Sequence, residues 1–598
     1  MEHCHLPPKH VDVLVIGGGP AGSYAASVLA LEGMKVTVFE ADKFPRYHIG
    51  ESLIPSIRPY MRFIGCEEKL ANYGFHRKPG SAIKFNQYKH EGYTDFVALG
   101  ADNNAWNVTR SEFDHLLLNH SRTCGTSVYE RTKVTSVTFS PDDPSRPTSV
   151  TYSHVPPPCS LSTPPSTPPP SPTRGGHDTN GFFEPVEPVV GTTSFNYMID
   201  ASGRTGVMST RYLKNRHFNS SLKNVAVWGY WTDVGTYGAD TPRQGSPWFE
   251  ALIGKHSVEV YQRKSDIRVL DESGWAWFIP LHNGKTSIGV VMNQEVYNEN
   301  KSTLSSFPPS VSTPNPSEST MVARYISNLG LAPGLVELIT ENGKMGEGSV
   351  KMASDFSYSA PSYAGNGYRI IGDAAAFIDP FFSSGVHLAI TGALSAALTI
   401  CASIRNNCSE QQAAGWHTKR VATSYTRFQV VVLSAYKQIR NQSHDILSDI
   451  DENNFDRAFT FLRPVIQGAS DMGSQLSETE LQKSLDFCVN LFNPTTPEQH
   501  ERLLTEGKVS KELLDVTAPI TDPSILSTAL KHDHITQGGS GSSSEETFYW
   551  NDCERMVLDK VNARKVVHNE YAINNLESEP LDGYVAHLKR GKLGLAPV

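Results

Sequence analysis

Residues 11–22 read VDVLVIGGGPAG, an apolar run followed by closely spaced glycines. The run at 11–16 has the composition of a buried β-strand, a helical pattern follows near 20–32, and a second apolar run, KVTVFE, occupies 35–40. Strand, glycine-rich turn, helix and strand in this order open a βαβ unit of the doubly wound α/β type. This stretch therefore predicts the fold class, α/β with a Rossmann-type domain.

The glycines of this turn have the spacing G-x-G-x-x-G. Glycine lets the chain turn tightly, and it lets the backbone approach a pyrophosphate at the N-terminus of the following helix. Glu40 ends the second strand, where a carboxylate can accept hydrogen bonds from a ribose diol. An ordinary glycine turn is the alternative, but strand, helix and acid together favour a nucleotide site. The expected contacts from the turn are Gly17, Gly18, Gly19, Ala21 and Gly22.

Composition excludes several classes of function. The chain has 598 residues, a net charge of −9 and no basic block, so a nucleic-acid partner is not expected. Its 8 cysteines are scattered without a C-x-x-C pair or a cysteine–histidine cluster, and we therefore expect no metal site. The first ten residues lack the apolar core of a signal peptide, which predicts a reduced, cytoplasmic compartment.

One uncharged segment resembles a membrane span by length alone. Residues 386–404, VHLAITGALSAALTICASI, contain no Asp, Glu, Lys or Arg. They are rich in Ala, Gly, Ser and Thr, which suits a helix in tight contact with a sheet or a cofactor. We expect a buried helix and no membrane attachment.

A proline-rich segment interrupts the region that follows the βαβ unit. Residues 156–172 contain 9 prolines in 17 residues, a composition that cannot pack a core. Strand character resumes after 190, so we interpret 156–190 as a loop inserted in a hairpin, with a domain linker as the alternative. Helical, charged patterns dominate beyond residue 400.

Three further segments specify the nucleotide. YRIIGDAAAFIDP at 368–380 resembles the segment with which flavoproteins of the aromatic-hydroxylase superfamily bind the ribityl chain, through Asp373 here. NVTRSEFDHLLL resembles their arginine segment and implies Arg110 near the flavin, and YMIDASGR resembles their turn around Asp200. The resemblance implies FAD. Since no second glycine fingerprint for NAD(P)H is visible, we expect a separate flavin reductase.

The predicted organisation is a Rossmann-type FAD domain with an inserted mixed β-sheet substrate region and a mainly helical C-terminal region. The core is expected over 11–400 and is discontinuous. The ranges are 11–80, 105–215 and 365–400 for the FAD parts, 81–104 and 216–350 for the substrate sheet, and 401–598 for the C-terminal region.

A tryptophan pair makes the resemblance specific. GWAWFIP at 274–280 is similar to the W-x-W-x-I-P motif of flavin-dependent halogenases, and FPRYHIGESL at 44–53 resembles a segment that implies Glu51 near the isoalloxazine. The resemblance covers most of 11–400, and fungal enzymes that chlorinate phenolic polyketides are the most similar members. In strand geometry Trp275 and Trp277 project to one side, where they form a wall between flavin and substrate. Plain core packing is the alternative.

The family resemblance implies the chemistry. Reduced FAD, O2 and chloride or bromide yield hypohalous acid, which reaches a lysine amine and then an electron-rich ring. Lys84 is the predicted amine: on a strand Ala82, Lys84 and Asn86 share one face, while Ile83 and Phe85 face the core. An exposed edge lysine is the alternative. Burial would lower its pKa and favour the neutral amine.

DPFFSSGVHLA, at the start of the helix predicted over 386–404, implies the halide site. Backbone N–H groups at a helix N-terminus bind anions without a charged side chain, and the family's halide contacts correspond to the amides of Ser384 and Gly385. Val386 is then expected to contact FAD. A plain serine cap is the alternative.

One departure concerns the substrate. Tryptophan halogenases carry a glutamate two residues after the proline of this segment, whereas Phe381 and Phe382 follow Pro380 here. An indole is therefore disfavoured, and a phenolic or other electron-rich aromatic secondary metabolite is expected. An FAD-dependent aromatic hydroxylase is the main alternative, and a prenyl reductase or membrane-attached flavoprotein is a third. The substrate's identity, its attachment to a carrier, the halide preference and any phenol-deprotonating base stay open.

Overall fold

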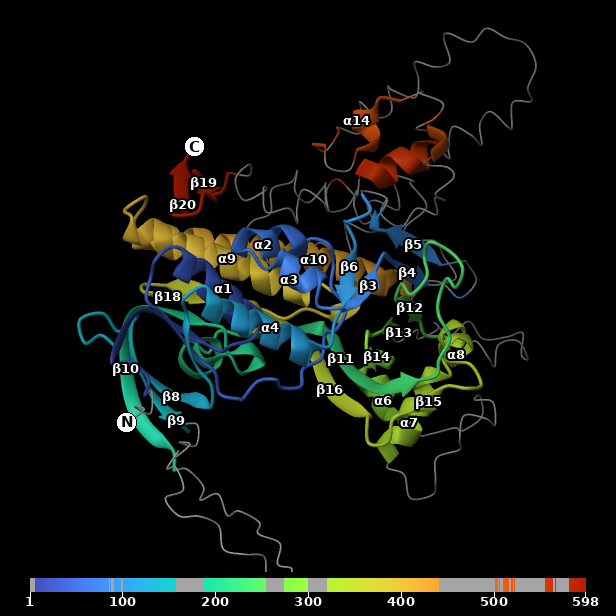
Figure 1. Ribbon diagram of the computed structural model, residues 1–598, viewed down its shortest axis with the longest axis horizontal. Helices are drawn as coiled ribbons and strands as arrows, with labels where there is room; N and C mark the ends of the chain where they lie inside the picture. Colours follow the sequence, from blue (N-terminus) through green and yellow to red (C-terminus); the bar gives the residue numbers. More distant parts are fainter. Residues whose placement is uncertain are drawn as a thin grey trace, which may run out of the picture.

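The computed structural model describes residues 6–84, 87, 91–97, 100–156, 187–253, 274–299 and 320–439, and shorter pieces at 501–503, 505, 509–515, 518–519, 521, 554–562, 565 and 580–598. Two eight-stranded sheets organise these residues, and long helices cover the first (Figure 1).

The first sheet begins with the predicted βαβ unit. Its strand order is β17-β18-β10-β1-β2-β7, and β8 and β9 extend it through β10. The pairs β2–β1, β1–β10 and β10–β18 are parallel, as in doubly wound folds. The strands are β1 (His10–Ile16), β2 (Val36–Phe39), β7 (Ser127–Tyr129), β8 (Thr132–Phe139), β9 (Pro147–His154), β10 (Val189–Asp200), β17 (Ala364–Gly365) and β18 (Tyr368–Ile370).

Buried helices cover one face of this sheet. Its apolar core combines β1 and β2 side chains with α1, α4 and α9, while the other face packs on β8 and β9. The helices are α1 (Pro20–Leu31), α2 (Ile57–Ile64), α3 (Glu67–Ala71), α4 (Arg110–Thr123), α9 (Gly385–Ile404) and α10 (Glu410–Ile439). Within the described chain α9 alone is long and apolar enough to cross a bilayer, and 89% of its apolar window is buried inside the protein, as expected for a core helix.

The proline-rich segment connects two paired strands. Val189 of β10 pairs with His154 of β9 in an antiparallel ladder, so the intervening chain closes a hairpin, as predicted. Residues 157–186 themselves lie outside the described residues.

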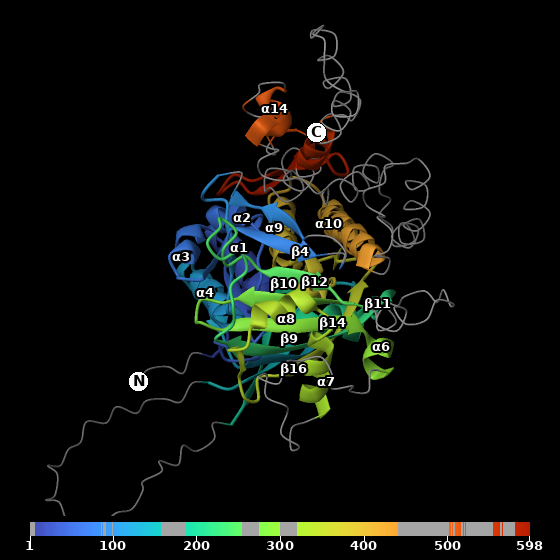
Figure 2. The same ribbon diagram turned by 90° about the vertical axis from the view of Figure 1, so that its right-hand side faces the viewer.

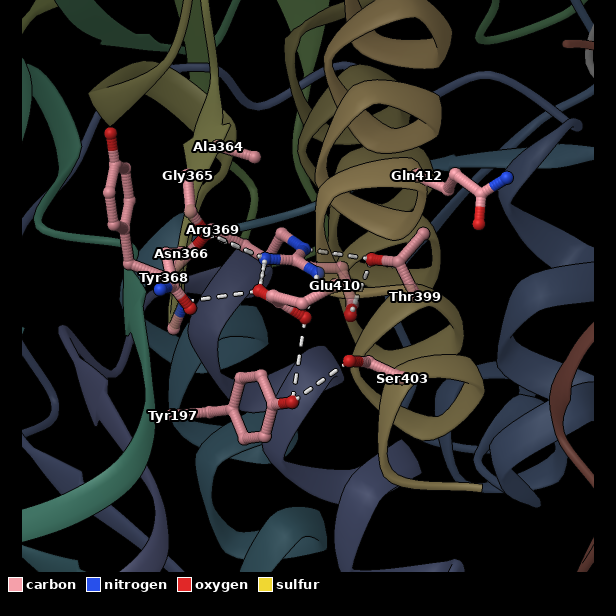
Figure 3. A network of polar contacts seen from close by, with 12 residues as sticks. Tyr197, Ala364, Gly365, Asn366, Tyr368, Arg369, Thr399, Ser403, Glu410 and Gln412 are labelled. Atoms are coloured by element: carbon pink, nitrogen blue, oxygen red, sulfur yellow. Dashed lines mark hydrogen bonds and ion pairs between the residues drawn. The ribbon is translucent and has the colours of Figure 1, made fainter. Parts of the chain in front are cut away.

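A buried ion pair ties the first sheet to the two long helices (Figure 3). Arg369 of β18 donates to Glu410 at the start of α10, at 2.8 Å, and to Thr399 of α9, at 3.0 Å. Tyr197 of β10 donates to Ser403 of α9 and to the same glutamate. Because Arg369 is fully buried, this network fixes how β18, α9 and α10 meet.

The second sheet is mixed, as predicted. Its order is β15-β11-β14-β13-β12-β4-β5, with β16 beside β11; β12–β4 is parallel and the other pairs are antiparallel. The sheet ends at Ser359, beyond the expected boundary at 350. The strands are β4 (Gly80–Lys84), β5 (Gly92–Asp95), β11 (His217–Thr232), β12 (Trp248–Ala251), β13 (Gly274–Pro280), β14 (Thr286–Asn293), β15 (Lys344–Met345) and β16 (Lys351–Ser359).

Both faces of this sheet are covered. One face packs on α6 (Gln294–Glu299), α7 (Thr320–Leu329) and α8 (Pro333–Ile339), and these helices lie on the outer side in Figure 2. The other face carries the tryptophan pair and packs in part on α10. A two-stranded sheet, β3 (His76–Lys78) with β6 (Ala105–Asn107), lies beside it.

The C-terminal region, predicted to be mainly helical, also contains a β-hairpin that the sequence analysis did not single out. It contains α10, α14 (Lys511–Leu514) and the helical residues 554–562, but the chain ends in a hairpin of β19 (Tyr584–His587) and β20 (Gly594–Pro597). Leu595 of β20 is buried in the core that surrounds α9. The hairpin's alternation is short, and charged residues flank it, so the helical pattern upstream hid it.

Candidate active site

A cavity of about 560 Å³ connects the two sheets. One end is bordered by the glycine-rich turn after β1 and by Glu40 after β2. The opposite end is bordered by Trp275 and Trp277 of β13 and by the start of α9. Sequence segments that are hundreds of residues apart thus contribute to one site.

The glycine turn has no room for side chains. Gly17 has φ +104°, and a Cβ there would lie 2.3 Å from the carbonyl oxygen of Ala201; a Cβ on Gly22 would lie 1.9 Å from that of Gly17. Helix α1 starts at Pro20, and its N-cap, Gly19, makes no side-chain cap. The helix N-terminus therefore presents backbone N–H groups to the cavity, as a pyrophosphate site requires.

Glu40 holds the turn in this shape. Its carboxylate accepts hydrogen bonds from the backbone N–H of Gly18, at 2.6 Å, and of Asp42, at 2.8 Å. Burial raises the pKa of Glu40, and these two N–H donors oppose the shift. Glu40 lines the cavity, in agreement with the predicted ribose contact, and it also braces the turn.

The flavin segments meet in the middle of the cavity. Arg110, at the start of α4, donates to Asp114 at 2.8 Å and to the carbonyl of Ile49 at 2.8 Å, so it anchors the 44–53 segment. Asp373 lines the cavity, and burial raises its pKa against the nearby guanidinium of Arg110. Asp200 is fully buried and accepts from Ser202 and the Met208 N–H, so it shapes the turn after β10.

The start of α9 forms the halide end. Ser383 has φ +56°, a left-handed conformation that is costly for serine, and it turns the helix N-terminus toward the cavity. Ser384 makes no side-chain cap, and its hydroxyl is buried with no hydrogen-bond partner among the described residues. Ser383, Gly385 and Val386 line the cavity. These observations disfavour the plain serine cap.

The tryptophan pair forms part of the cavity wall. The two rings lie 5.7 Å apart, and Trp275 also meets Phe381 edge-on at 5.0 Å. The indole N–H of Trp275 donates to Tyr436 of α10 at 2.9 Å, and that of Trp277 donates to Ser287 at 3.1 Å. Hydrogen bonds at the far edge of each ring fix both indoles in place.

A third tryptophan, which the sequence analysis did not single out, extends the wall. Trp228 of β11 lines the cavity, lies 6.4 Å from the Trp277 ring and donates to the Tyr47 hydroxyl at 2.8 Å. Since it lies outside the W-x-W motif, only the pairing of β11 with β14 reveals it.

Lys84, the predicted amine, is the last residue of β4, and its catalytic role stays a prediction. It pairs with Glu250 in register, and its ammonium is 4.0 Å from that carboxylate. Glu250 is fully buried and accepts from the Leu335 N–H of α8 at 2.7 Å. Ile83, next to Lys84, packs with Trp275 instead. Ala82 and Ile83 belong to two different apolar cores, and Phe85 and Asn86, which the predicted alternation also includes, lie outside the described residues.

A second lysine, the buried Lys78, contacts the segment that lines the cavity but is not itself a lining residue. Lys78 of β3 is 1% exposed and donates to the Ser52 hydroxyl at 2.8 Å and to the Leu53 carbonyl at 2.9 Å. Ser52 lines the cavity and is bonded through Asn107 to the Pro280 carbonyl at the end of the tryptophan motif. Burial lowers the pKa of Lys78 to about 7. Its polar sequence context, HRKPG, gave no signal of burial.

The residues present suit FAD. The turn after β1 leaves a cradle that a single Cβ would fill, the helix N-terminus above it is uncapped, and Glu40 and Asp373 line the same cavity. A doubly wound sheet with this cavity at the ends of its parallel strands defines a dinucleotide-dependent oxidoreductase.

Comparison with known proteins identifies the family. The model of the family "Tryptophan halogenase" matches residues 12–152 and 254–484. A flavin-dependent halogenase of Armillaria mellea is 48% identical over 98% of both chains, and one of Acremonium egyptiacum is 42% identical over 98% of this chain and 93% of its own. The protein belongs to the flavin-dependent halogenases.

Solved structures agree with the fold. The myxobacterial chondrochloren halogenase, described as a variant of FAD-dependent halogenases, is 25% identical and superposes with a TM-score of 0.57 over 82% of this chain and 99% of its own. CmlS, a flavin-dependent halogenase, is 23% identical with a TM-score of 0.59 over 85% of this chain and 79% of its own. As a member of this family the protein uses FAD, O2 and a halide and acts on aromatic substrates.

Proposed function

We propose that this halogenase is a chlorinase of a phenolic or other electron-rich aromatic secondary metabolite, and that bromide is accepted at the same site. The observation that carries the proposal is the common cavity, which an uncapped helix N-terminus and an indole wall border beside the predicted flavin site. Backbone N–H groups select a small anion by charge and size, which suits chloride and bromide alike.

The lack of a carboxylate after Pro380 supports a phenol over an indole. Phe382, two residues after Pro380, packs edge-on against Phe381 at 4.9 Å and against the core that contains Trp275, so the position that would carry an acid is part of an apolar cluster. A phenol donates electron density from its own oxygen to the ring and depends less on such an acid.

Each part of the site has a separate task. When bound, reduced FAD supplies the two electrons with which O2 oxidises the halide to hypohalous acid. The amides of Ser384 and Gly385 hold the halide, and the indoles of Trp275 and Trp277 exclude the aromatic substrate from the oxidising end.

Lys84 is the predicted amine that receives the oxidised halogen, and Lys78 is a second candidate for this role. A pKa lowered to about 7 leaves a substantial fraction of Lys78 as the free amine at neutral pH, and only the free amine has the lone pair to form a haloamine. Ser52, which lines the cavity, and the Leu53 carbonyl accept hydrogen bonds from its nitrogen.

The test supplies the protein with FAD, NADH, a flavin reductase, a resorcinol-type phenol and chloride or bromide, followed by mass spectrometry. We expect the halogen isotope pattern on the phenol, with chloride accepted at physiological concentration. A hydroxylated product without halogen, formed at the same rate in halide-free buffer, would contradict the proposal. The reductase is expected to be a separate protein, in the same cytoplasmic compartment.

A further inference from the structure

One carboxyl oxygen of Glu51 has a hydrogen-bond partner in the fold, and the other has none in the described part of the chain. Its Oε1 accepts a hydrogen bond from the Tyr230 hydroxyl at 2.7 Å, whereas Oε2 is buried with no hydrogen-bond partner in the described part of the chain. The side chain is 3% exposed and lines the cavity. A buried carboxyl oxygen that is left unsatisfied requires an explanation, and a protonated oxygen that faces a reactant provides one.

The surroundings of Glu51 favour its neutral form. Burial raises its pKa, and the hydroxyls of Tyr230 and Ser287 and the guanidinium of Arg110 only partly oppose the shift. Arg110 is itself bound to Asp114, which neutralises much of its charge. Burial therefore favours the protonated form of Glu51 more than it would for an exposed glutamate.

A chain of hydroxyls leads from Glu51 to an exposed side chain. The Tyr230 hydroxyl lies 3.1 Å from the Tyr47 hydroxyl, which accepts from the Trp228 indole at 2.8 Å. Tyr47 is 49% exposed, and the Lys351 ammonium lies over its ring at 4.6 Å. These contacts form a hydrogen-bonded path from a solvent-accessible ring to a buried acid.

The reaction needs such a path. Reduced FAD, O2, one halide ion and one proton give FAD, hypohalous acid and water, so each turnover consumes a proton with the halide. The two electrons come from the flavin, the halide is oxidised, one oxygen atom enters the hypohalous acid and the other leaves as water. The proton must arrive where the indole wall and a buried anion site limit access of bulk water.

We propose that Glu51 is the proton donor for halide oxidation and that Tyr230 and Tyr47 return a proton to it. The Oε2–H bond breaks, and the proton passes to the oxygen that leaves as water. Oε1 then takes a proton from the Tyr230 hydroxyl, which is restored from Tyr47, and Tyr47 is restored from water. Rotation of the carboxyl group then brings the O–H bond back to the Oε2 position, so that the next turnover starts from the same state. Glu51 thereby gains a role in addition to a contact with the flavin, and Tyr230 becomes a positioning residue that orients Glu51.

The first test needs no cofactor. Infrared difference spectra of the full-length protein, titrated across neutral pH without FAD, should contain the carbonyl band of a protonated carboxyl group that Glu51→Gln removes. Tyr230→Phe should shift the frequency of this band, because it removes a hydrogen bond to Oε1. A band with an ordinary glutamate titration, or no band assigned to Glu51, would overturn the proposal.

The second test follows the fate of the flavin electrons. With FAD affinity measured separately, Tyr230→Phe should lower halogenated product per NADH by about tenfold and should raise released hydrogen peroxide. The expected loss is below the roughly hundredfold or more for a lost proton donor, because Glu51 itself is still present. The rate of halogenated product formation should fall more in D2O for the wild type than for Glu51→Gln. In the variant, position 51 no longer donates a proton.

A matched control variant distinguishes the loss of the proposed proton relay from the loss of a tyrosine hydroxyl elsewhere in the protein. Tyr237 donates to Glu91 at 2.8 Å, the same tyrosine–glutamate pair, but it packs in the core on the other face of the second sheet. Tyr237→Phe should leave product per NADH and peroxide release unchanged. If Tyr237→Phe and Tyr230→Phe lower halogenated product per NADH equally, at unchanged FAD affinity, Tyr230 has only a structural role and the proposed proton relay is wrong.

Discussion

Two regions of the molecule, the face of the second sheet that packs on α7 and α8 and the border of the cavity, each contain a buried glutamate, Glu250 and Glu51, and the two differ in their hydrogen bonds. On the face that packs on α7 and α8, Trp231 donates to Tyr325 at 2.9 Å, and Glu250 accepts from the Trp248 indole and from two backbone N–H groups of α8. On the cavity side of the molecule, the Glu51 Oε2 and the Ser384 hydroxyl have no partner among the described residues.

The difference separates structural from functional groups. A buried acid such as Glu250, which accepts several hydrogen bonds, stabilises the junction between β12 and α8. A buried polar atom that is unsatisfied beside a cavity is available to a ligand. Lys78 and Lys84 also differ in their partners, because Lys78 donates to Ser52, which lines the cavity, and Lys84 pairs with Glu250. Four predictions test the comparison, from the largest expected effect on halogenation to the smallest.

Replacement of the amine that receives the oxidised halogen should have the largest effect, and Lys78→Ala tests the second candidate for this role. If Lys78 is the amine, we expect a fall of about a thousandfold in the rate of halogenated product, within the range for loss of a catalytic nucleophile or base. FAD binding and NADH consumption should persist, because Lys78 contacts Ser52 and Leu53 and no residue of the glycine turn.

Lys84→Ala is the matched variant, and product analysis of both by mass spectrometry decides between the two lysines. If Lys78 is the amine, we expect at most a few-fold loss in Lys84→Ala, because an ion pair at 4.0 Å with a partly exposed lysine contributes little. If Lys84→Ala abolishes halogenation and Lys78→Ala does not, Lys84 is the amine, as the family resemblance implies.

Replacement of the wall should cause the next largest change. Trp275→Phe and Trp277→Phe remove indole N–H groups bonded to Tyr436 and Ser287 and shrink the barrier. We expect about a tenfold lower ratio of halogenated product to NADH, with more released peroxide or hydroxylated product, because a looser wall admits water and substrate.

Trp231→Phe provides the control for the wall, since it removes an indole with an equivalent hydrogen bond from the opposite face. Its ratio of product to NADH should stay at the wild-type value, although unfolding in urea should start earlier. Equal uncoupling in all three variants would assign the tryptophans to the core and leave the wall without support.

The pH dependence should be smaller, and its sign follows from Lys78. Because its pKa is lowered to about 7, the neutral amine falls to about one-tenth of the molecules at pH 6 and exceeds nine-tenths at pH 8. Single-turnover product formation, measured with pre-reduced FAD, should therefore rise about fivefold from pH 6 to pH 7. A rate independent of pH over this range would show that the neutral amine does not limit the reaction.

Substitution of the two buried glutamates should affect the free energy of unfolding differently, with a loss for Glu250→Gln and none for Glu51→Gln. Glu250→Gln removes charge-assisted hydrogen bonds and should cost about 1–3 kcal/mol in the free energy of unfolding, while folded protein stays active. Burial raises the pKa of Glu51. Above that pKa the folded protein must hold a buried charge, which lowers its stability. Glu51→Gln removes this charge and should not destabilise the protein at pH 8. Urea unfolding at pH 8 measures both; equal losses would remove the distinction between the two acids.

Much of the fold could be predicted because its signals are local. The run at 11–16 became β1 (His10–Ile16), and the helix expected from 20 became α1 (Pro20–Leu31). The glycine turn, Glu40 and the Gly-Asp segment at 372–373 border one cavity. The sequence could predict these features because each depends on the backbone conformation of only a few neighbouring residues. The terminal hairpin of β19 and β20 was missed, since its strands are too short to show alternation.

The amino-acid sequence by itself determined the doubly wound core, the FAD site and the halogenase family, because these reside in short motifs with fixed spacing. The sequence also fixed which side chains alternate along β4, but not which face of the sheet borders the cavity. Only the tertiary structure decided that, by pairing β4 with β12 and by packing α8 against Glu250. It likewise placed Lys78, Trp228 and Tyr230 at the site, because burial and proximity depend on contacts between distant segments.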